Sequence, residues 1–184
     1  MCSVRGRRDT EHEFKAALER TQPAGTAEWR AANEVRIGDA LSALTPSSLR
    51  EVGVIYADPP YTRDHYSRYY HVYETMYLYD FPDARGHGRT RSDGFVSGFS
   101  TKSGVIAAFN ALFRNAAVSR LPMAISYPSN GLLQQAGGAI VPVAEAHGFD
   151  VERREIEVEH STLGASKGSS RKAATEELYL CRPS

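Results

Sequence analysis

The chain has 184 residues and a mass of 20.3 kDa, which suits one domain that buries about 70% of the surface its unfolded form exposes. Hydrophobic residues make up 41% and charged residues 24%, a globular composition that excludes collagen-like, coiled-coil and disordered chains. Lysine plus arginine total 22, as do aspartate plus glutamate. Because the formal net charge is zero, a nucleic-acid partner would need a local basic patch.

The two cysteines, Cys2 and Cys181, lie near opposite ends of the sequence and have no neighbour at the spacing of a metal site or a redox motif. We therefore expect a reduced, cytoplasmic protein. His147 and His160 also lack companions at metal-ligand spacing, so no metal is predicted. No apolar run is long enough for a membrane span, and no apolar stretch follows the basic start as in a signal peptide.

Residues 1–33 are predicted to form a basic, partly helical extension. Thr10 opens a capping box for a helix over residues 11–20, and Thr26 can cap a second, shorter helix. The remaining segment, residues 34–184, has the alternating strand and helix patterns of an α/β domain.

Within that domain, residues 52–57 form a continuous apolar run with β-branched side chains, which predicts a strand buried on both faces. Residues 83–100 show neither period, so a long loop is predicted, and such loops are often functional. The other predicted elements are strands over residues 35–37, 122–127, 151–158 and 178–181, and helices over residues 40–44, 67–79, 105–118, 131–135 and 141–147.

Strands that alternate with helices indicate a three-layer α/β fold with a largely parallel sheet. The last two predicted strands are neighbours along the chain, so we expect them to pair as an antiparallel hairpin.

The segment with the clearest chemistry is Asp58, Pro59, Pro60 and Tyr61, directly after the strand over residues 52–57. Ligands of α/β folds bind at the carboxyl ends of such strands. A carboxylate and a backbone carbonyl can accept the two hydrogens of an exocyclic amine and localise its lone pair. The prolines fix their φ angles and aim the Pro59 carbonyl, and the tyrosine ring can stack on a base. A strand-ending turn without catalytic function is the other interpretation.

This sequence of four residues after a hydrophobic strand resembles the active loop of the Dam-like adenine-specific DNA methyltransferases. Residues 65–74, 125–131, 159–164 and 176–178 are similar to later parts of these enzymes. The resemblance implies a Rossmann-like class I fold for residues 34–184 and methyl transfer from S-adenosylmethionine to the N6 amine of an adenine flipped out of DNA. It implies that Asp58, Pro59, Pro60 and Tyr61 hold the adenine and that Asp58 also lies at the cofactor.

The resemblance suggests a role for one more residue, and position in the sequence suggests roles for others. Asp39, after Gly38, is similar to the acidic residue that accepts the adenine amine of the cofactor, although it can equally be the N-cap of the next helix. Tyr66 and Arg68 are the residues near the loop that we expect to contact DNA, whereas most tyrosines between residues 66 and 79 are expected to pack. Arginines between residues 85 and 91 belong to a solvated loop or contact phosphates.

One departure from the family is large. Its members begin with an apolar strand and a glycine-rich turn for the methionine part of the cofactor, and nothing ahead of Val35 fits that pattern. The chain therefore resembles the carboxyl-terminal part of a methyltransferase whose first strands are missing. An open strand edge is an aggregation hazard, so we expect a second chain that supplies the missing strands, or direct pairing of residues 35–37 with residues 54–56.

The sequence thus predicts an adenine-specific DNA methyltransferase that acts by direct transfer. Cytosine carbon methylation is disfavoured because no cysteine stands where a nucleophile is needed. The alternative is a remnant or DNA-binding partner subunit without cofactor binding. RNA or a free nucleotide is a weaker alternative substrate.

Overall fold

The computed structural model describes residues 12, 15–16, 25–160 and 172–184. The chain divides into two compact units, residues 1–38 and 39–184. In the first unit, α2 (Ala27–Ala31) begins where the Trp29 amide donates a 3.2 Å hydrogen bond to Thr26 Oγ1, which confirms the predicted cap. Most of the predicted helix over residues 11–20 lies outside the described residues.

The predicted strand over residues 35–37 is wrong, because these residues form no strand. Val35 is 90% exposed and Ile37 102% exposed. A single extended segment gains stability only when its backbone groups pair with a neighbouring strand. The expected pairing with residues 54–56 is also wrong, because β4 is the sheet neighbour of β1 in the described part of the chain.

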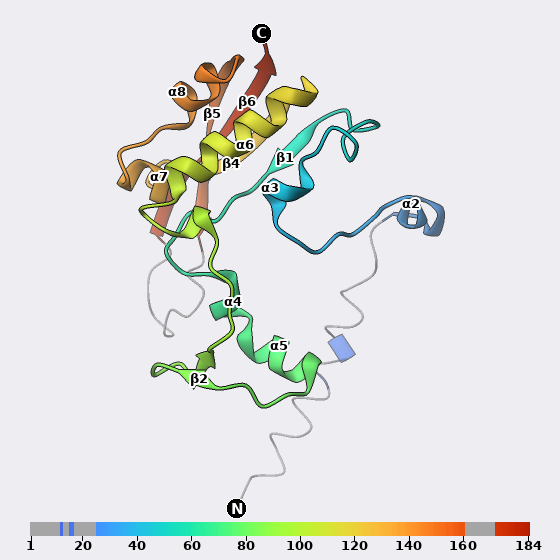
Figure 1. The fold of residues 1–184 in the computed structure, drawn as a ribbon, viewed down its shortest axis with the longest axis vertical. Coiled ribbons are helices and arrows are strands. Elements are labelled where there is room, and N and C mark those ends of the chain that lie inside the picture. Colours follow the sequence, from blue (N-terminus) through green and yellow to red (C-terminus); the bar gives the residue numbers. More distant parts are fainter. Residues whose placement is uncertain (1–11, 13–14, 17–24, 161–171) are drawn as a thin grey trace, which may run out of the picture. The chain divides into compact units, whose positions relative to one another are not determined.

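The second unit contains a four-stranded sheet with the order β1-β4-β6-β5 (Figure 1). Its strands are β1 (Ile55–Ala57), β4 (Met123–Pro128), β5 (Phe149–His160) and β6 (Lys172–Pro183). β1 runs parallel to β4, whereas β4 and β5 each run antiparallel to β6. The prediction of a largely parallel sheet is therefore wrong, because the long hairpin of β5 and β6 contributes most of the pairing. The predicted antiparallel pairing of the last two strands is confirmed.

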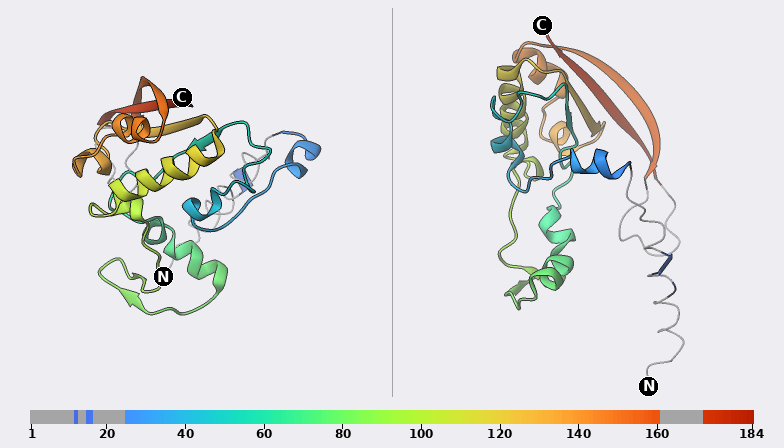
Figure 2. Two further views of the ribbon diagram at one scale, coloured as in Figure 1. Left: turned by 45° about the horizontal axis from the view of Figure 1, so that its top comes forward. Right: turned by 90° about the vertical axis from the view of Figure 1, so that its right-hand side faces the viewer.

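Helices cover one face of this sheet (Figure 2). They are α3 (Ala40–Ala43), α6 (Val105–Ser119), α7 (Leu132–Gln135) and α8 (Ile140–Ala146), as predicted within a few residues. On β6, the buried residues Glu177, Tyr179 and Cys181 alternate with half-buried ones, as a strand with one covered face requires. The core lies between this face and α6, whose Phe109 and Phe113 are fully buried. The four-stranded sheet and these helices of the second unit thus form two layers, and the expected third layer is not confirmed.

β1 is shorter and more exposed than the predicted buried strand over residues 52–57. Ile55 faces the core at 8% exposure, whereas Val54 is 56% exposed and Tyr56 is 65% exposed. The apolar run reads as a strand buried on both faces, but β1 has one strand neighbour and one covered face in the described part of the sheet.

Between β1 and α6 the chain forms α4 (Tyr66–Tyr69) and α5 (His71–Leu78), which confirm the predicted tyrosine-rich helix with a break at Tyr70. The predicted loop over residues 83–100 contains more structure than expected. It holds a hairpin of β2 (Ala84–Arg85) and β3 (Thr90–Arg91), and the short helix η1 (Gly98–Ser100). Among the described residues, no helix has the length and apolar character of a membrane span.

Candidate active site

The loop of Asp58, Pro59, Pro60 and Tyr61 follows β1 and lies beside the turn that follows β4. The two strands are parallel, with Ala57 opposite Ile125, so their carboxyl ends meet at the same edge of the sheet. The backbone amide of Leu132 donates a 2.9 Å hydrogen bond to the Tyr61 carbonyl oxygen. This bond satisfies an amide at the start of α7 and fixes the end of the loop.

Close packing holds the neighbouring turn. A Cβ atom at Gly131 would lie 2.3 Å from Cε1 of the buried Tyr127 ring, so only glycine allows this approach. The Tyr127 hydroxyl accepts a 3.0 Å hydrogen bond from the Leu133 amide. The Tyr61 carbonyl is therefore held by the amide of Leu132, a residue of the hydrophobic core.

Within the loop, Pro59 is buried and Pro60 is half-buried, whereas Asp58 is exposed and Tyr61 is 41% exposed. The two prolines hold the backbone with fixed φ angles and no amide donors. The structure thus presents a carboxylate and an aromatic ring on either side of a stiff, anchored corner.

A second carboxylate shares the sheet face with Asp58. Ala57 on β1 is opposite Ile125 on β4, so the next residues, Asp58 and Ser126, are also neighbours across the two strands. On the other side of β4, Ser126 is opposite Leu178 of β6, and Glu176 lies two residues from Leu178. Because side chains alternate between faces, Asp58, Ser126 and Glu176 lie on the same face. Ser126 Oγ donates a 2.6 Å hydrogen bond to Glu176 Oε1. Burial, and then the charge of Glu176, raise the pKa of Asp58.

Tyr66, the first residue of α4, belongs to the same cluster. The pKa of Tyr66 is raised first by burial and then by the charges of Asp58, Tyr61 and Tyr70, so its hydroxyl group interacts electrostatically with both ends of the loop. The ring is 46% exposed and stacks on Tyr70 with a centroid separation of 6.2 Å. Of the two residues expected to contact DNA, the structure brings Tyr66 to the loop.

The other expected contact, Arg68, forms an exposed 3.2 Å ion pair with Asp64, which lies four residues earlier and just before α4. Asp39 is the N-cap of α3, where its Oδ2 accepts hydrogen bonds of 2.8 and 2.7 Å from the amide and hydroxyl of Ser42. These bonds lower the pKa of Asp39 and keep it ionised. The structure therefore accounts for Asp39 by capping, and its role at a cofactor stays a prediction.

Sequence reasoning missed Ser126 and Glu176 as members of the site. The available signal was a hydroxyl inside the apolar run over residues 122–127, because a buried polar side chain is expected to have a partner. The partner lies 50 residues away along the chain. No group of three or more metal-ligating side chains occurs among the described residues.

A family model for D12 class N6 adenine-specific DNA methyltransferases matches residues 11–129, more than half of the chain. The chain therefore belongs to this family of adenine-specific DNA methyltransferases.

Two curated relatives are modification enzymes. The modification methylase LlaI of Lactococcus lactis subsp. lactis is 32% identical over 139 residues, which cover 72% of this chain and 22% of the relative. The type II methyltransferase M.FokI of Planomicrobium okeanokoites is 34% identical over 99 residues, which cover 52% of this chain and 14% of the relative. The chain thus spans less than a quarter of each relative's length. No solved structure matches it significantly.

Proposed function

We propose that this chain carries the base-binding half of an adenine-specific DNA methyltransferase, which transfers a methyl group from S-adenosylmethionine to N6 of an adenine flipped out of DNA. The observation that carries the proposal is the anchored corner of Asp58, Pro59, Pro60 and Tyr61, with Asp58 and Tyr61 both exposed. A base that leaves the stack needs hydrogen bonds to its edge and a ring on its face.

The chemistry assigns a role to each residue. An ionised Asp58 and the Pro59 carbonyl accept the two N6 hydrogens, which moves the nitrogen lone pair out of conjugation with the ring. Tyr61 stacks on the purine, a contact worth about 1–3 kcal/mol per base, and Tyr66 borders the same space. Bound S-adenosylmethionine supplies the electrophilic methyl group. As the bond from N6 to the methyl carbon forms, the bond from that carbon to the donor sulfur would break and leave the thioether, S-adenosylhomocysteine. The nitrogen, positively charged at that stage, then loses one proton, which Asp58 would accept.

The residues present fit only part of the cofactor. Asp39 is exposed and ionised and can accept the cofactor's adenine amine. The described residues contain no strand followed by a glycine-rich turn that could hold the methionine part. We therefore assign no further step to the cofactor and limit the mechanism to the adenine side.

The sheet supports a second chain that completes this site. β1 ends the described sheet, its far edge has no strand neighbour there, and Val54 and Tyr56 are largely exposed. A Rossmann-like class I sheet would continue past this edge and carry helices on the uncovered face. In this proposal residues 34–184 are the catalytic-type domain, residues 1–33 are an extension, and the partner contributes the missing strands.

The alternative function is a DNA-binding partner subunit or remnant that does not bind cofactor. The missing methionine-binding turn among the described residues favours it. Calorimetry of the chain with S-adenosylmethionine separates the two, because tight binding by this chain alone excludes the alternative.

The test of the main proposal uses the active assembly, this chain together with the partner that completes its site. It measures methyl transfer into duplex DNA from labelled S-adenosylmethionine, with the modified base identified by mass spectrometry. We expect N6-methyladenine, and a loss of at least a thousandfold in Asp58→Ala. Glu145→Gln, an exposed change on α8, is the control and should retain full activity. Activity of Asp58→Ala within tenfold of wild type would remove Asp58 from the mechanism, and modified cytosine would contradict the assigned base.

A further inference from the structure

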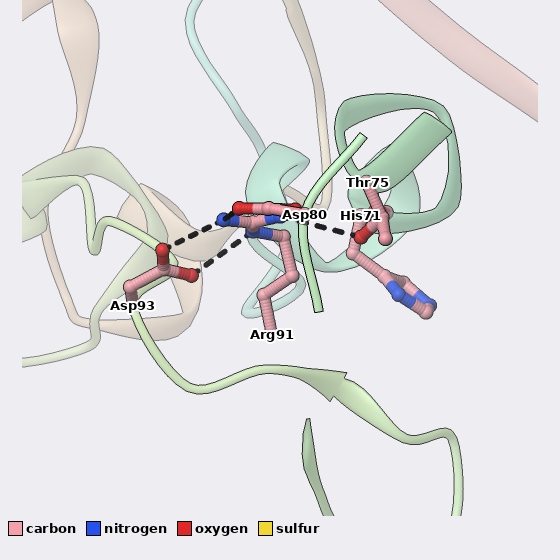
Figure 3. A network of polar contacts seen from close by, with 5 residues as sticks. All are labelled: His71, Thr75, Asp80, Arg91 and Asp93. Atoms are coloured by element: carbon pink, nitrogen blue, oxygen red, sulfur yellow. Dashed lines mark hydrogen bonds and ion pairs between the residues drawn. The ribbon is translucent and has the colours of Figure 1, made fainter. Parts of the chain in front are cut away.

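The segment after α5 is closed by a clamp around Arg91 of β3 (Figure 3). The Arg91 guanidinium donates hydrogen bonds of 2.6 and 2.8 Å to the two carboxylate oxygens of Asp80, and of 3.0 and 2.8 Å to those of Asp93. It also lies 3.3 Å from Thr75 Oγ1 on α5. Bidentate pairs of this kind combine charge with fixed geometry. The clamp therefore joins the two ends of residues 80–93 and ties them to α5.

The hydrogen bonds of this clamp occupy the guanidinium group of Arg91. Its side chain is only 6% exposed, the two carboxylates raise its pKa, and it lowers the pKa of both. Of the arginines between residues 85 and 91, Arg91 is thus the one that cannot meet a phosphate. Its place in the hairpin is structural.

The tip of the same hairpin is different. Arg85, His87 and Arg89 are exposed, and within the described residues neither Arg85 nor Arg89 forms an ion pair. The turn between them has positive φ at Gly86 (67°) and at Arg89 (46°), a conformation that is unfavourable for arginine. Backbone strain of this kind persists only where the surroundings enforce it, and it is concentrated at functional sites.

The hairpin is attached to the elements that follow the candidate active loop. Ser67 Oγ of α4 donates a 2.8 Å hydrogen bond to the Phe95 carbonyl oxygen, just after the hairpin. α4 begins with Tyr66, five residues after the end of the candidate active loop at Tyr61. Hydrogen bonds therefore link the hairpin to α4 and α5, the two helices that follow the candidate active loop.

We infer that residues 84–91 form a phosphate-binding hairpin for the DNA backbone. In this hairpin Arg85 and Arg89 contact phosphates, and Arg91 is a positioning residue that holds the tip. The inference rests on the proposed function, which supplies DNA as the partner. Two uncompensated guanidinium groups match phosphate geometry. A contact that reads phosphates rather than base edges adds affinity without sequence preference.

The test is duplex DNA binding at several salt concentrations. Each phosphate contact contributes about 0.9 to the slope of log affinity against log salt, so Arg85→Ala with Arg89→Ala should lower the slope by about 1.8. The matched control is Arg50→Ala with Arg114→Ala, two exposed arginines, one in a turn before β1 and one on α6. It removes the same charge and should leave the slope within 0.5 of the wild-type value, by the same estimate of about 0.9 per contact. An unchanged slope in the tip variant, or an equal loss in the control, overturns the inference.

Arg91→Lys tests the clamp around Arg91, because lysine keeps the positive charge but cannot form the two bidentate pairs with Asp80 and Asp93. We expect a several-fold loss of affinity at an unchanged salt slope, together with faster amide exchange of residues 84–91. Wild-type affinity with unchanged exchange would contradict the positioning role. If the wild-type chain binds no DNA, the proposed function fails. If the wild-type chain binds DNA and the variant at Arg85 and Arg89 keeps the wild-type salt slope, only the proposed phosphate contacts of the hairpin fail.

Discussion

Ser126 Oγ on β4 donates a 2.6 Å hydrogen bond to Glu176 Oε1 on β6, and this bond fixes a second carboxylate on the sheet face that carries Asp58. Two negative charges near one another favour protonation of one of them. Burial makes the largest contribution to the raised pKa of Asp58, and Glu176 adds to it. The charge of Glu176 therefore helps to raise the pKa of Asp58, the residue that we propose binds the N6 amine.

The first prediction concerns pH. If Asp58 must be ionised to accept the N6 hydrogens, activity falls as pH drops through its raised pKa. Glu176→Gln removes one charge and keeps an acceptor for Ser126, so the acidic limb of the kcat/KM profile should move to lower pH. Glu145→Gln should leave it in place. Carbon-13 NMR of the Asp58 carboxyl gives the same shift without turnover, and an identical titration in both proteins would contradict the coupling.

The second prediction concerns stability. A carboxyl group with a raised pKa in the folded state binds its proton more tightly there than when unfolded, so ionisation destabilises the fold. Stability is lost as pH rises from the unfolded pKa, about 3.9, through the folded value. Asp58→Asn should thus raise Tm near neutral pH, and its advantage should shrink toward pH 4. Thermal unfolding at several pH values checks this. A Tm of the wild-type protein that rises relative to that of Asp58→Asn as pH increases would refute it.

The third prediction concerns the turn beneath the loop. Gly131→Ala places a Cβ atom 2.3 Å from the Tyr127 ring, so the ring or the turn must move. Overpacking of this kind costs about 1–3 kcal/mol, measurable by urea unfolding. Gly53→Ala is the matched control, since a Cβ there meets nothing within 4 Å, and it should change stability by less than about 0.5 kcal/mol. Equal effects of the two changes would contradict the packing.

The fourth prediction concerns the core. Phe109 is fully buried, and its ring packs edge-on against Phe99 at 5.3 Å and Tyr127 at 5.2 Å. Phe109→Ala should lower the free energy of unfolding by about 3–5 kcal/mol. Val118→Ala, at a 65% exposed position of the same helix, should cost less than about 0.5 kcal/mol. A mild Phe109→Ala variant would mean that this helix face is not the core.

The parts that sequence predicted best are those whose signal is local. The helix over residues 105–118 and the strand over residues 122–127 have clear periodicity and cover α6 and β4 almost residue for residue. The corner at Pro59 and Pro60 was predictable because proline fixes the backbone whatever surrounds it.

The remaining features depend on distant partners. Glu176 joins the site through the register of β6 on β4, and Arg91 closes its hairpin through Asp80 and Asp93. Neither pairing has a signature in a single sequence. Residues 35–37 have the composition of a strand, but a strand also needs a neighbour, which the described part of the chain does not provide.

The most direct test of the central claim compares two duplexes that hold either adenine or purine opposite an abasic site, so that the base is already free to leave the stack. The two bases differ only in the N6 amine. A hydrogen bond to an ionised carboxylate contributes about 1.5–3 kcal/mol, so the wild-type chain should bind the adenine duplex at least about tenfold more tightly. Asp58→Ala should lose at least about tenfold of this preference and keep only the part that the Pro59 carbonyl contributes. Equal binding by the wild-type chain would show that Asp58 does not hold the amine.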